Sequence, residues 1–425
     1  MRPLLLFLIA LPLAAQTAVP LDEALDRAHT QAIDVLRADA QIESARVSVE
    51  AARDRRWPAL SLDLGGGQRY GLSFDQTSGD LTQSTVESMD VGVSASYLVF
   101  DGNERRAETR SAEATLRAAE LNRARAEQVA SAAVLRGYLA VAQAEAARAV
   151  SVENVAAEEE LLRVVEAQVE MGERPAFEVA QQQERVATAR ASVVAAERDR
   201  EIAEARLVRL LGLDPSGAYT FPVPPPADGT VPGAEALAAL ALDQRTDLRA
   251  AEVAVEAAEA DGRAARASRL PQVSVGAYVG TSYSSAGEVT FPGQIGDNRA
   301  GSLRLGVSLP ILDRGQSRQR IRQAEARATA LRAEQADAER AVALEVRELR
   351  IELDALDAQA ELAEVRVAAA EAALDAERAR YEGGETTLQS VSQLQARLVE
   401  ARTERERIRV AARFQRRLID VAVGM

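Results

Sequence analysis

The sequence repeats itself once, with an offset that stays at 212–213 residues along the whole unit. Short markers keep this register past prolines and glycines, where chance similarity between segments rich in alanine, glutamate and arginine would lose it. A constant offset of this kind indicates two copies of one structural unit. The recurring pairs are Asp34 and Asp247, Pro58 and Pro271, Asp101 and Asp313, Gly172 and Gly384, and Gly212 and Gly424.

A segment rich in proline and glycine separates the two copies. Residues 213–234 carry too many prolines to be helical, because proline lacks the backbone donor that a helix needs. We therefore expect a first repeat at residues 16–212, an inter-repeat linker at 213–234 and a second repeat at 235–425.

Within each copy the hydrophobic period changes from helix-like to strand-like. A helical pattern at about residues 21–56, and again at 235–268, ends before a proline. Apolar and polar residues then alternate, which is typical of strands with one apolar face. The predicted strands are about residues 59–73 and 89–100 in the first copy and 271–283 and 301–312 in the second, joined by polar loops around 76–87 and 284–299.

After the strands a long helical pattern returns, and each long helix is expected to turn back at a glycine, near residues 172–175 and 383–386. At 1.5 Å per residue, the outgoing arm of the first hairpin reaches roughly 100 Å. The second copy also shows an apolar heptad and a second apolar face, which together predict a helix that packs on both sides. The heptad is Val342, Val346, Leu349, Leu353, Leu356, Ala360, Ala363, Val367, Ala370 and Leu374, and the second face is Leu344, Ile351, Ala358 and Val365.

The N-terminus predicts export. Residues 1–15 combine Arg2, an apolar run and two small residues, which is the pattern of a signal peptide cleaved after Ala15. No later apolar stretch reaches the length of about 20 residues that a membrane-spanning helix needs. If the mature chain enters a membrane, we expect it to do so through its strands.

Four strands are too few to close a membrane barrel, since known barrels have at least eight. An open sheet in lipid would leave edge amides without partners, so the strands of several chains must be pooled. Two chains would provide eight strands and a lumen filled by side chains, whereas three would provide twelve strands and room for a duct. Asp63 and Arg304 are expected to face the lumen. Aromatic residues near the strand ends are expected at the membrane interfaces: Trp57, Tyr97, Phe100, Tyr278 and Tyr283. The alternative is a soluble β-sandwich layer whose aromatics are ordinary core residues.

Charge and residue types argue against several other functions. A net charge of −14 disfavours nucleic-acid binding. The chain has no cysteine and a single histidine, His29, and it carries no phosphate-binding loop or serine elbow. We therefore expect neither an enzyme nor a metal site or cofactor.

In order and duplicated spacing, several segments resemble the outer-membrane efflux protein family of TolC-like channels. They are the helix-to-strand entries at Pro58 and Pro271, YLVFDG (Tyr97 to Gly102), LPILDRG (Leu309 to Gly315) and YEGGETTLQSVSQLQARL (Tyr381 to Leu398). The resemblance covers about residues 21–424. It implies a homotrimer with a shared 12-stranded outer-membrane β-barrel, continued by a periplasmic α-barrel of long coiled-coil hairpins. It also implies a tripartite efflux or type I secretion system, in which a periplasmic adaptor joins this exit duct to an inner-membrane transporter.

The resemblance also assigns roles near the hairpin turns. The adaptor-contacting tips would be Gly172, Glu173 and Arg174 with Gly384, Glu385 and Thr386. Tyr381 matches the family tyrosine that helps to hold the closed tip. Ser390 and Gln393 stand where the family has paired aperture aspartates, and Glu178 is the equivalent position in the first copy. Glu178 could supply a ring of carboxylates, or it could be a solvated glutamate favoured by the helix dipole.

Two alternatives stay open at this point. An exported periplasmic coiled-coil scaffold or adaptor without a pore would explain the heptads, but not the matched pairs of alternating strands. The cargo of a duct could be drugs, metal cations or polypeptides, because the sequence shows no specificity pocket.

Overall fold

The computed structural model describes residues 17–74, 81–225, 229–285 and 290–424. The expected signal peptide at residues 1–15 lies outside this part of the chain. The chain divides into two compact units, one formed by residues 1–40, 121–248 and 337–425 and the other by residues 41–120 and 249–336. Each repeat contributes to both units, so the two repeats are not two separate domains.

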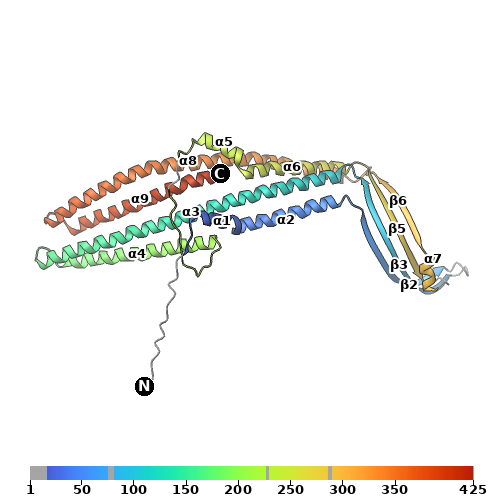
Figure 1. Ribbon diagram of the computed structural model, residues 1–425, viewed down its shortest axis with the longest axis horizontal. Coiled ribbons are helices and arrows are strands. Elements are labelled where there is room, and N and C mark those ends of the chain that lie inside the picture. The colour runs from blue at the N-terminus through green and yellow to red at the C-terminus, as the bar shows by residue number, and fades with distance from the viewer. Residues whose placement is uncertain (1–16, 75–80, 226–228, 286–289, 425) are drawn as a thin grey trace, which may run out of the picture. The chain divides into compact units, whose positions relative to one another are not determined.

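The helices occur in equivalent pairs, one from each repeat (Figure 1). The first repeat contains α1 (Leu21–Gln31), α2 (Ile33–Asp54), α3 (Glu104–Glu170) and α4 (Phe177–Leu210). The second contains α5 (Ala234–Gln244), α6 (Thr246–Ala267), α8 (Gln316–Glu382) and α9 (Leu388–Val423). Paired helices have matching lengths: α3 and α8 have 67 residues each, and α2 and α6 have 22 each. Among the described residues, no helix is both long and apolar enough to cross a membrane.

Each opening helix is divided in two, whereas the sequence pattern predicts one continuous helix in each repeat. The breaks fall at Ala32, with φ −61° and ψ 135°, and at Arg245, with φ −66° and ψ 124°. Both residues have extended backbone geometry, and neither a proline nor a glycine marks the break. In the second repeat the break is stabilised by Arg245, whose buried side chain donates to Asp247 and Glu345.

The first unit contains two antiparallel helical hairpins, α3 with α4 and α8 with α9 (Figure 1). Much of the predicted heptad of α8 is buried there, for example Val346, Leu353 and Val367. The second apolar face stays open, since Leu344, Ile351 and Val365 are 56%, 57% and 64% exposed. A single chain therefore covers only one of the two seams that the sequence predicts.

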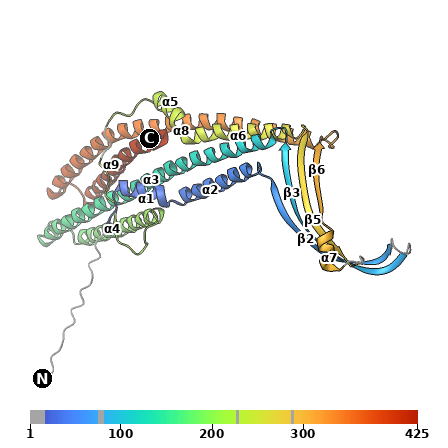
Figure 2. The same cartoon turned by 45° about the vertical axis from the view of Figure 1, so that its right-hand side comes forward.

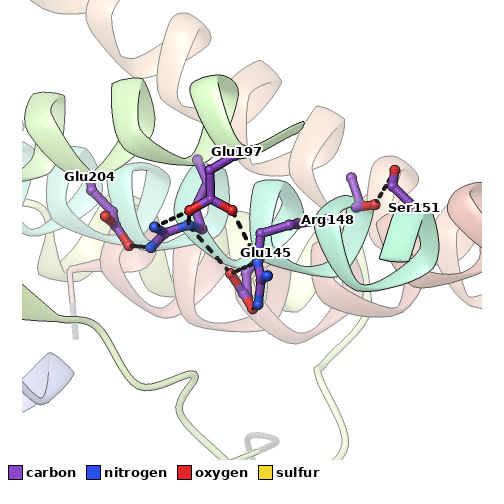
Figure 3. Close-up of polar contacts among 7 residues, drawn as sticks. Glu145, Arg148, Ser151, Glu197 and Glu204 are labelled. Carbon is purple, nitrogen blue, oxygen red and sulfur yellow. Dashed lines mark hydrogen bonds and ion pairs between the residues drawn. The ribbon is translucent and has the colours of Figure 1, made fainter. Parts of the chain in front are cut away.

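The α3–α4 hairpin also carries a chain of ion pairs (Figure 3). Arg148 binds Glu145 at 2.8 Å, and Arg200 on α4 binds Glu197 at 2.6 Å and Glu204 at 2.5 Å. Longer contacts of 3.7–3.8 Å connect the two helices, from Arg148 to Glu197 and from Arg200 to Glu145. These side chains are partly exposed, so each pair contributes only about 0–1 kcal/mol.

The second unit contains a four-stranded antiparallel sheet in the order β2-β3-β5-β6 (Figure 2). Its strands are β2 (Ala59–Phe74), β3 (Leu81–Phe100), β5 (Gln272–Ser284) and β6 (Ala300–Ser308). β3 begins earlier than predicted because the hairpin pairs as far as Phe74 and Leu81. β6 ends at Ser308 rather than near residue 312, since Pro310 cannot donate to a strand ladder. The short helix α7 (Phe291–Asp297) lies in the predicted loop between β5 and β6.

Two further strands, β1 (Thr17–Ala18) and β4 (Tyr219–Thr220), pair in parallel in the first unit. They hold the segment that precedes α1 against the inter-repeat linker. The hydroxyl of Tyr138 donates to the carbonyl of Val19 at 2.7 Å, and its ring packs edge-on against Phe221. The linker is therefore attached to the helices through a buried aromatic contact.

Candidate functional site

The two hairpin turns are closed by the same backbone device. Gly172 and Gly384 have φ angles of 76° and 79°, a left-handed geometry that glycine adopts without strain. The next residue in each turn donates back across the last helical turn, Glu173 to the carbonyl of Gln168 and Glu385 to that of Arg380, both at 2.9 Å. The glycines at these positions are therefore required by the turn.

A cluster of side chains next to these turns connects one hairpin to the other. The phenol of Tyr381 on α8 donates to Oε2 of Glu178 on α4 at 2.6 Å. The guanidinium of Arg174 lies 4.2 Å from the centre of the Tyr381 ring. Arg174 also donates to the backbone carbonyls of Tyr381 and of Thr386, the latter at 3.4 Å. We call Arg174, Glu178 and Tyr381 the tip clasp.

Two members of the tip clasp, Tyr381 and Glu178, are buried, which strengthens the hydrogen bond between them. Tyr381 is 1% exposed and Glu178 is 7% exposed. Burial raises the pKa of the Tyr381 phenol, and the hydrogen bond to Glu178 raises it further, so the phenol stays protonated and donates. Glu178 is thus a buried acceptor and not the solvated glutamate of the alternative interpretation. Arg174 was expected at the adaptor-contacting surface, but its side chain turns inward to Tyr381.

The other predicted tip residues lie at or close to the turns. Gly172, Glu173, Gly384 and Glu385 are exposed, and Thr386 is partly buried. Gln393 is exposed one turn into α9. Ser390 lies in the first turn of α9, where its backbone N–H is capped by the side chain of Thr387. Within the described part of the chain, Glu178 and Tyr381 are thus the two of the four predicted gate residues that are hydrogen-bonded to each other.

Sequence reasoning missed a second buried polar contact behind the clasp. Gln182 on α4 is fully buried and donates to the Glu158 side chain on α3 at 2.6 Å and to the Glu158 carbonyl at 3.0 Å. On the other hairpin, Gln395 donates to Asn154 at 2.9 Å and accepts from Arg378 at 3.0 Å. From the sequence, no role was assigned to Gln182 or Gln395. Their polarity on a buried helix face is the signal that could have identified them.

The sheet separates its polar and apolar side chains by register. Asp63 pairs with Gly92 and Arg304 pairs with Gly276, and the register places all four residues on the same face of the sheet. Asp63 is hydrogen-bonded on this face to Ser61 and Ser94, so we call it the polar face. The opposite face is apolar and exposed, and its side chains include Leu60, Leu62, Leu64, Val93, Val279, Leu303, Leu305 and Val307.

The predicted interface aromatics do not all lie on the apolar face. Tyr97 and Tyr283 share it, because they pair with Val275 and Met89. Tyr278 pairs with Ser94 and Ser302 on the polar face, so it lies on the face opposite to Tyr97 and Tyr283. A Cβ at Gly92 would lie 2.4 Å from the Tyr278 ring, which shows that the missing side chain makes room for this ring. Trp57 is 75% exposed just before β2, and Phe100 is 45% exposed at the end of β3.

Asp101 and Asp313, one of the recurring pairs of the repeat, lie just before the long helices α3 and α8. Asp101 accepts from the backbone N–H of Arg105 at 3.1 Å, and Asp313 accepts from that of Ser317 at 2.7 Å. Both contacts satisfy donors of a first helical turn. Hydrogen bonds from Ser317, and then from Gly315, lower the pKa of Asp313 to about 2.

Comparison with known proteins places this arrangement in a class. The outer membrane protein VceC from Vibrio cholerae has the same fold, with a TM-score of 0.82 at 20% identity over 95% of this chain and 96% of that one. The CusC channel gives a TM-score of 0.83 at 18% identity over 95% of this chain and 92% of that one. The fold is that of the TolC-like outer-membrane channels.

The chain belongs to the outer membrane efflux protein family, whose profile matches residues 24–213 and 237–419. The pyoverdine export outer membrane protein OpmQ of Pseudomonas aeruginosa is 29% identical over 405 residues, which is 93% of this chain and 82% of the relative. The outer membrane efflux protein BepC of Brucella suis is 27% identical over 288 residues, 68% of this chain and 59% of the relative. The protein is therefore an outer-membrane efflux channel with a helical periplasmic extension. This family is one of channels and not of enzymes, and it favours the channel over the pore-free scaffold.

Proposed function

We propose that three copies of the chain form one exit duct, in which each contributes four strands to a 12-stranded barrel and its hairpins to a periplasmic α-barrel. The observation that carries this proposal is the sheet itself. β2 and β6 each pair on one side only among the described strands. β6 runs antiparallel to β5, so the β2 of a neighbouring copy can continue the alternation of strand direction after β6.

The apolar face of the sheet has the height that a membrane requires. Phe100 pairs with Val273 near the helical end, and Met89 pairs with Tyr283 at the other. From Val273 to Tyr283, β5 advances by ten residue steps, which extend about 33 Å along the strand. With the usual tilt of about 40°, this becomes about 25 Å, the height of the apolar band in outer-membrane barrels. Trp57, Tyr97 and Phe100 then form one interfacial belt and Tyr283 belongs to the other.

The opposite face of the sheet is proposed to line the lumen. Asp63 and Arg304 lie on this face together with small residues such as Ser61, Ser94 and Gly276. Small polar side chains suit a water-filled duct, because they leave space and hydrogen-bond to water.

The exposed seam of α8 supports pooling of the helical part as well. Leu344, Ile351 and Val365 repeat along one open face of this helix. We propose that a neighbouring copy covers this face, so that six hairpins close the α-barrel. Burial of such a seam stabilises association by about 25 cal/mol for each Å² removed from water.

The tip clasp is proposed to hold the periplasmic end closed. It ties the two hairpins of one chain together through Tyr381, Glu178 and Arg174. Opening would require these contacts to break. The exposed residues Gly172, Glu173, Gly384 and Glu385, with Thr386, are proposed to meet a periplasmic adaptor, which also engages an inner-membrane transporter. Ser390 and Gln393 remain candidate aperture residues beside the clasp.

Small molecules are the cargo that the relatives favour. One relative is described as a pyoverdine export protein and another as an efflux protein. We propose that this duct conducts small molecules rather than folded polypeptides, and that the transporter selects among them.

The channel activity is tested with protein extracted from outer membranes and reconstituted into a planar lipid bilayer. We expect discrete single-channel steps that increase when the tip clasp is broken by Tyr381→Phe. Protein that inserts stably without any conductance, in both the wild type and this variant, would contradict the duct.

A further inference from the structure

Helix α7 occupies the place where β6 would continue if it were as long as its neighbours. β6 pairs with β5 from Gln272 to Gly280, and β5 goes on for four further residues, 281–284. In the chain, α7 comes just before β6, separated from it by Asn298 and Arg299. Figure 2 shows α7 beside the end of β5, with β2 and β3 continuing past it.

The side chains of this segment satisfy the free edge of β5. Gln294 accepts from the backbone N–H of Ser284 at 2.8 Å and donates to its carbonyl at 2.9 Å. Asn298 donates to the carbonyl of Ser282 at 2.8 Å, and Thr281 donates to the carbonyl of Ile295 at 2.9 Å. An unpaired strand edge is open to pairing with another chain, and these contacts close it. They also fix α7 firmly in position, because Gln294 is 5% exposed.

The outer side of α7 carries an aromatic residue that its own chain leaves half open. Phe291 packs edge-on against Tyr283, with ring centres 5.0 Å apart, yet it is 47% exposed. Tyr283 belongs to the apolar face of the sheet. Phe291 therefore extends this face beyond the end of β6.

The neighbouring strand in the shared barrel has a matching overhang. β2 has 16 residues and β6 has 9. If the β2 of a neighbour starts beside Ser308, its first nine residues pair with β6. The remaining seven residues, 68–74, then extend past β6 and lie beside α7. This overhang presents Tyr70 and Leu72, which are 72% and 74% exposed. Both lie an even number of residues along β2 from Leu60, Leu62 and Leu64, so they lie on the same apolar face as Phe291.

We propose that α7 is a contact between protomers, in which Phe291 packs against Tyr70 and Leu72 of the neighbouring copy. This inference rests on the proposed shared barrel and goes beyond it. It assigns to α7 the task of continuing the seam between two chains past the last paired residue of β6. The residues that cover α7 belong to a second copy of the chain. In the proposed barrel the β2 of the next copy follows β6, and its residues 68–74 lie beside α7.

The test uses cysteine pairs, since the natural chain has no cysteine. Phe291→Cys and Tyr70→Cys are introduced into separately tagged chains that are expressed together, and outer membranes are treated with a short bismaleimide. We expect a covalent dimer that carries both tags, at a yield at least tenfold above that of either single variant. Phe291→Cys with Leu60→Cys is the matched control, because Leu60 lies at the opposite end of β2 and should not react.

A second set of pairs keeps the two proposals apart. Leu305→Cys on β6 is combined in turn with Leu60→Cys, Leu62→Cys and Leu64→Cys on β2, and one of these should cross-link across the seam. Cross-linking at the seam without any between Phe291→Cys and Tyr70→Cys or Leu72→Cys would overturn the α7 contact and leave the shared barrel standing. Absence of both would contradict the barrel as well.

The free energy of the contact is tested by removal of the ring. Phe291→Ala should lower the temperature at which detergent-extracted trimers dissociate, by several degrees, whereas Phe177→Ala, at an exposed phenylalanine in the other unit, should not. Equal dissociation temperatures for wild type and Phe291→Ala would count against α7 as a protomer contact.

Discussion

Tyr381 of α8 and Glu178 of α4 are joined by a hydrogen bond of 2.6 Å, although they lie in different repeats and 203 residues apart. The bond connects the two hairpins of one chain beside their turns. It is buried, and Arg174 covers the tyrosine ring from the other side. The two hairpins are therefore held together beside their turns by a contact between the two repeats.

Loss of the phenol should favour the open tip. Tyr381→Phe removes the hydrogen bond and keeps the ring, and bonds to charged groups contribute about 1.5–3 kcal/mol. We expect the open fraction in single-channel recordings to rise roughly tenfold or more. Glu178→Ala should act in the same direction and weaken block by divalent cations. The control is Glu173→Gln at the exposed turn, and an unchanged channel in both clasp variants would refute the gate.

Arg174 should not be replaceable by lysine. Its planar group stacks on Tyr381 and donates to two carbonyls, which a single ammonium cannot reproduce. We expect Arg174→Lys to open the tip nearly as much as Arg174→Ala. Combined with Tyr381→Phe, it should add less than its separate effect, because the two residues act on one contact. Additive effects in this double-mutant cycle would show that they act independently.

Gln182, the buried glutamine of the first hairpin, should contribute to the free energy of unfolding and not to the geometry of the hairpin turn. Gln182→Leu leaves the buried carboxyl group of Glu158 without its partner, at a cost of about 1–3 kcal/mol. Thermal melting followed by circular dichroism should shift downward by several degrees. The neighbouring Gln183 is exposed, so Gln183→Leu is a matched control that should melt like the wild type. Equal melting of the two variants would contradict the role of Gln182.

The cap of α8 should depend on pH in a defined direction. The pKa of Asp313 is about 2 in the fold and 3.8 ordinarily, so its contribution is complete above the ordinary value and is lost as pH falls through about 2. We expect Asp313→Ala to melt below the wild type at about pH 6 and to match it near pH 2. A difference that persists unchanged at the lower pH would exclude the carboxylate as its source.

The helices, strands and turns were predicted mainly from hydrophobic periodicity and from the positions of proline and glycine. The offset located equivalent helices, and alternation located the strands, because both patterns depend only on local geometry. Alternation also places position 278 in phase with Ser274 and Gly276, so the polar placement of Tyr278 was available from the pattern. It was assigned to the interface from residue type and from its position near a strand end, without regard to this phase.

The remaining features depend on contacts between distant segments. The breaks at Ala32 and Arg245 have no proline or glycine, and the second is stabilised by Glu345 on another helix. Asp247, which the sequence shows only as one of the recurring residues of the repeat, binds Arg245 and Arg125. Burial raises its pKa, but these arginines outweigh burial and lower it. Likewise, nothing local to Arg174 distinguishes an exposed turn residue from one that stacks on Tyr381.

The claim that three copies share one duct is tested most directly by the mass of the intact particle. The protein is extracted from outer membranes in mild detergent and measured by native mass spectrometry. The account predicts a single particle with the mass of three mature chains, which dissociates to monomers on heating. A particle of one or two chains that still conducts would contradict it.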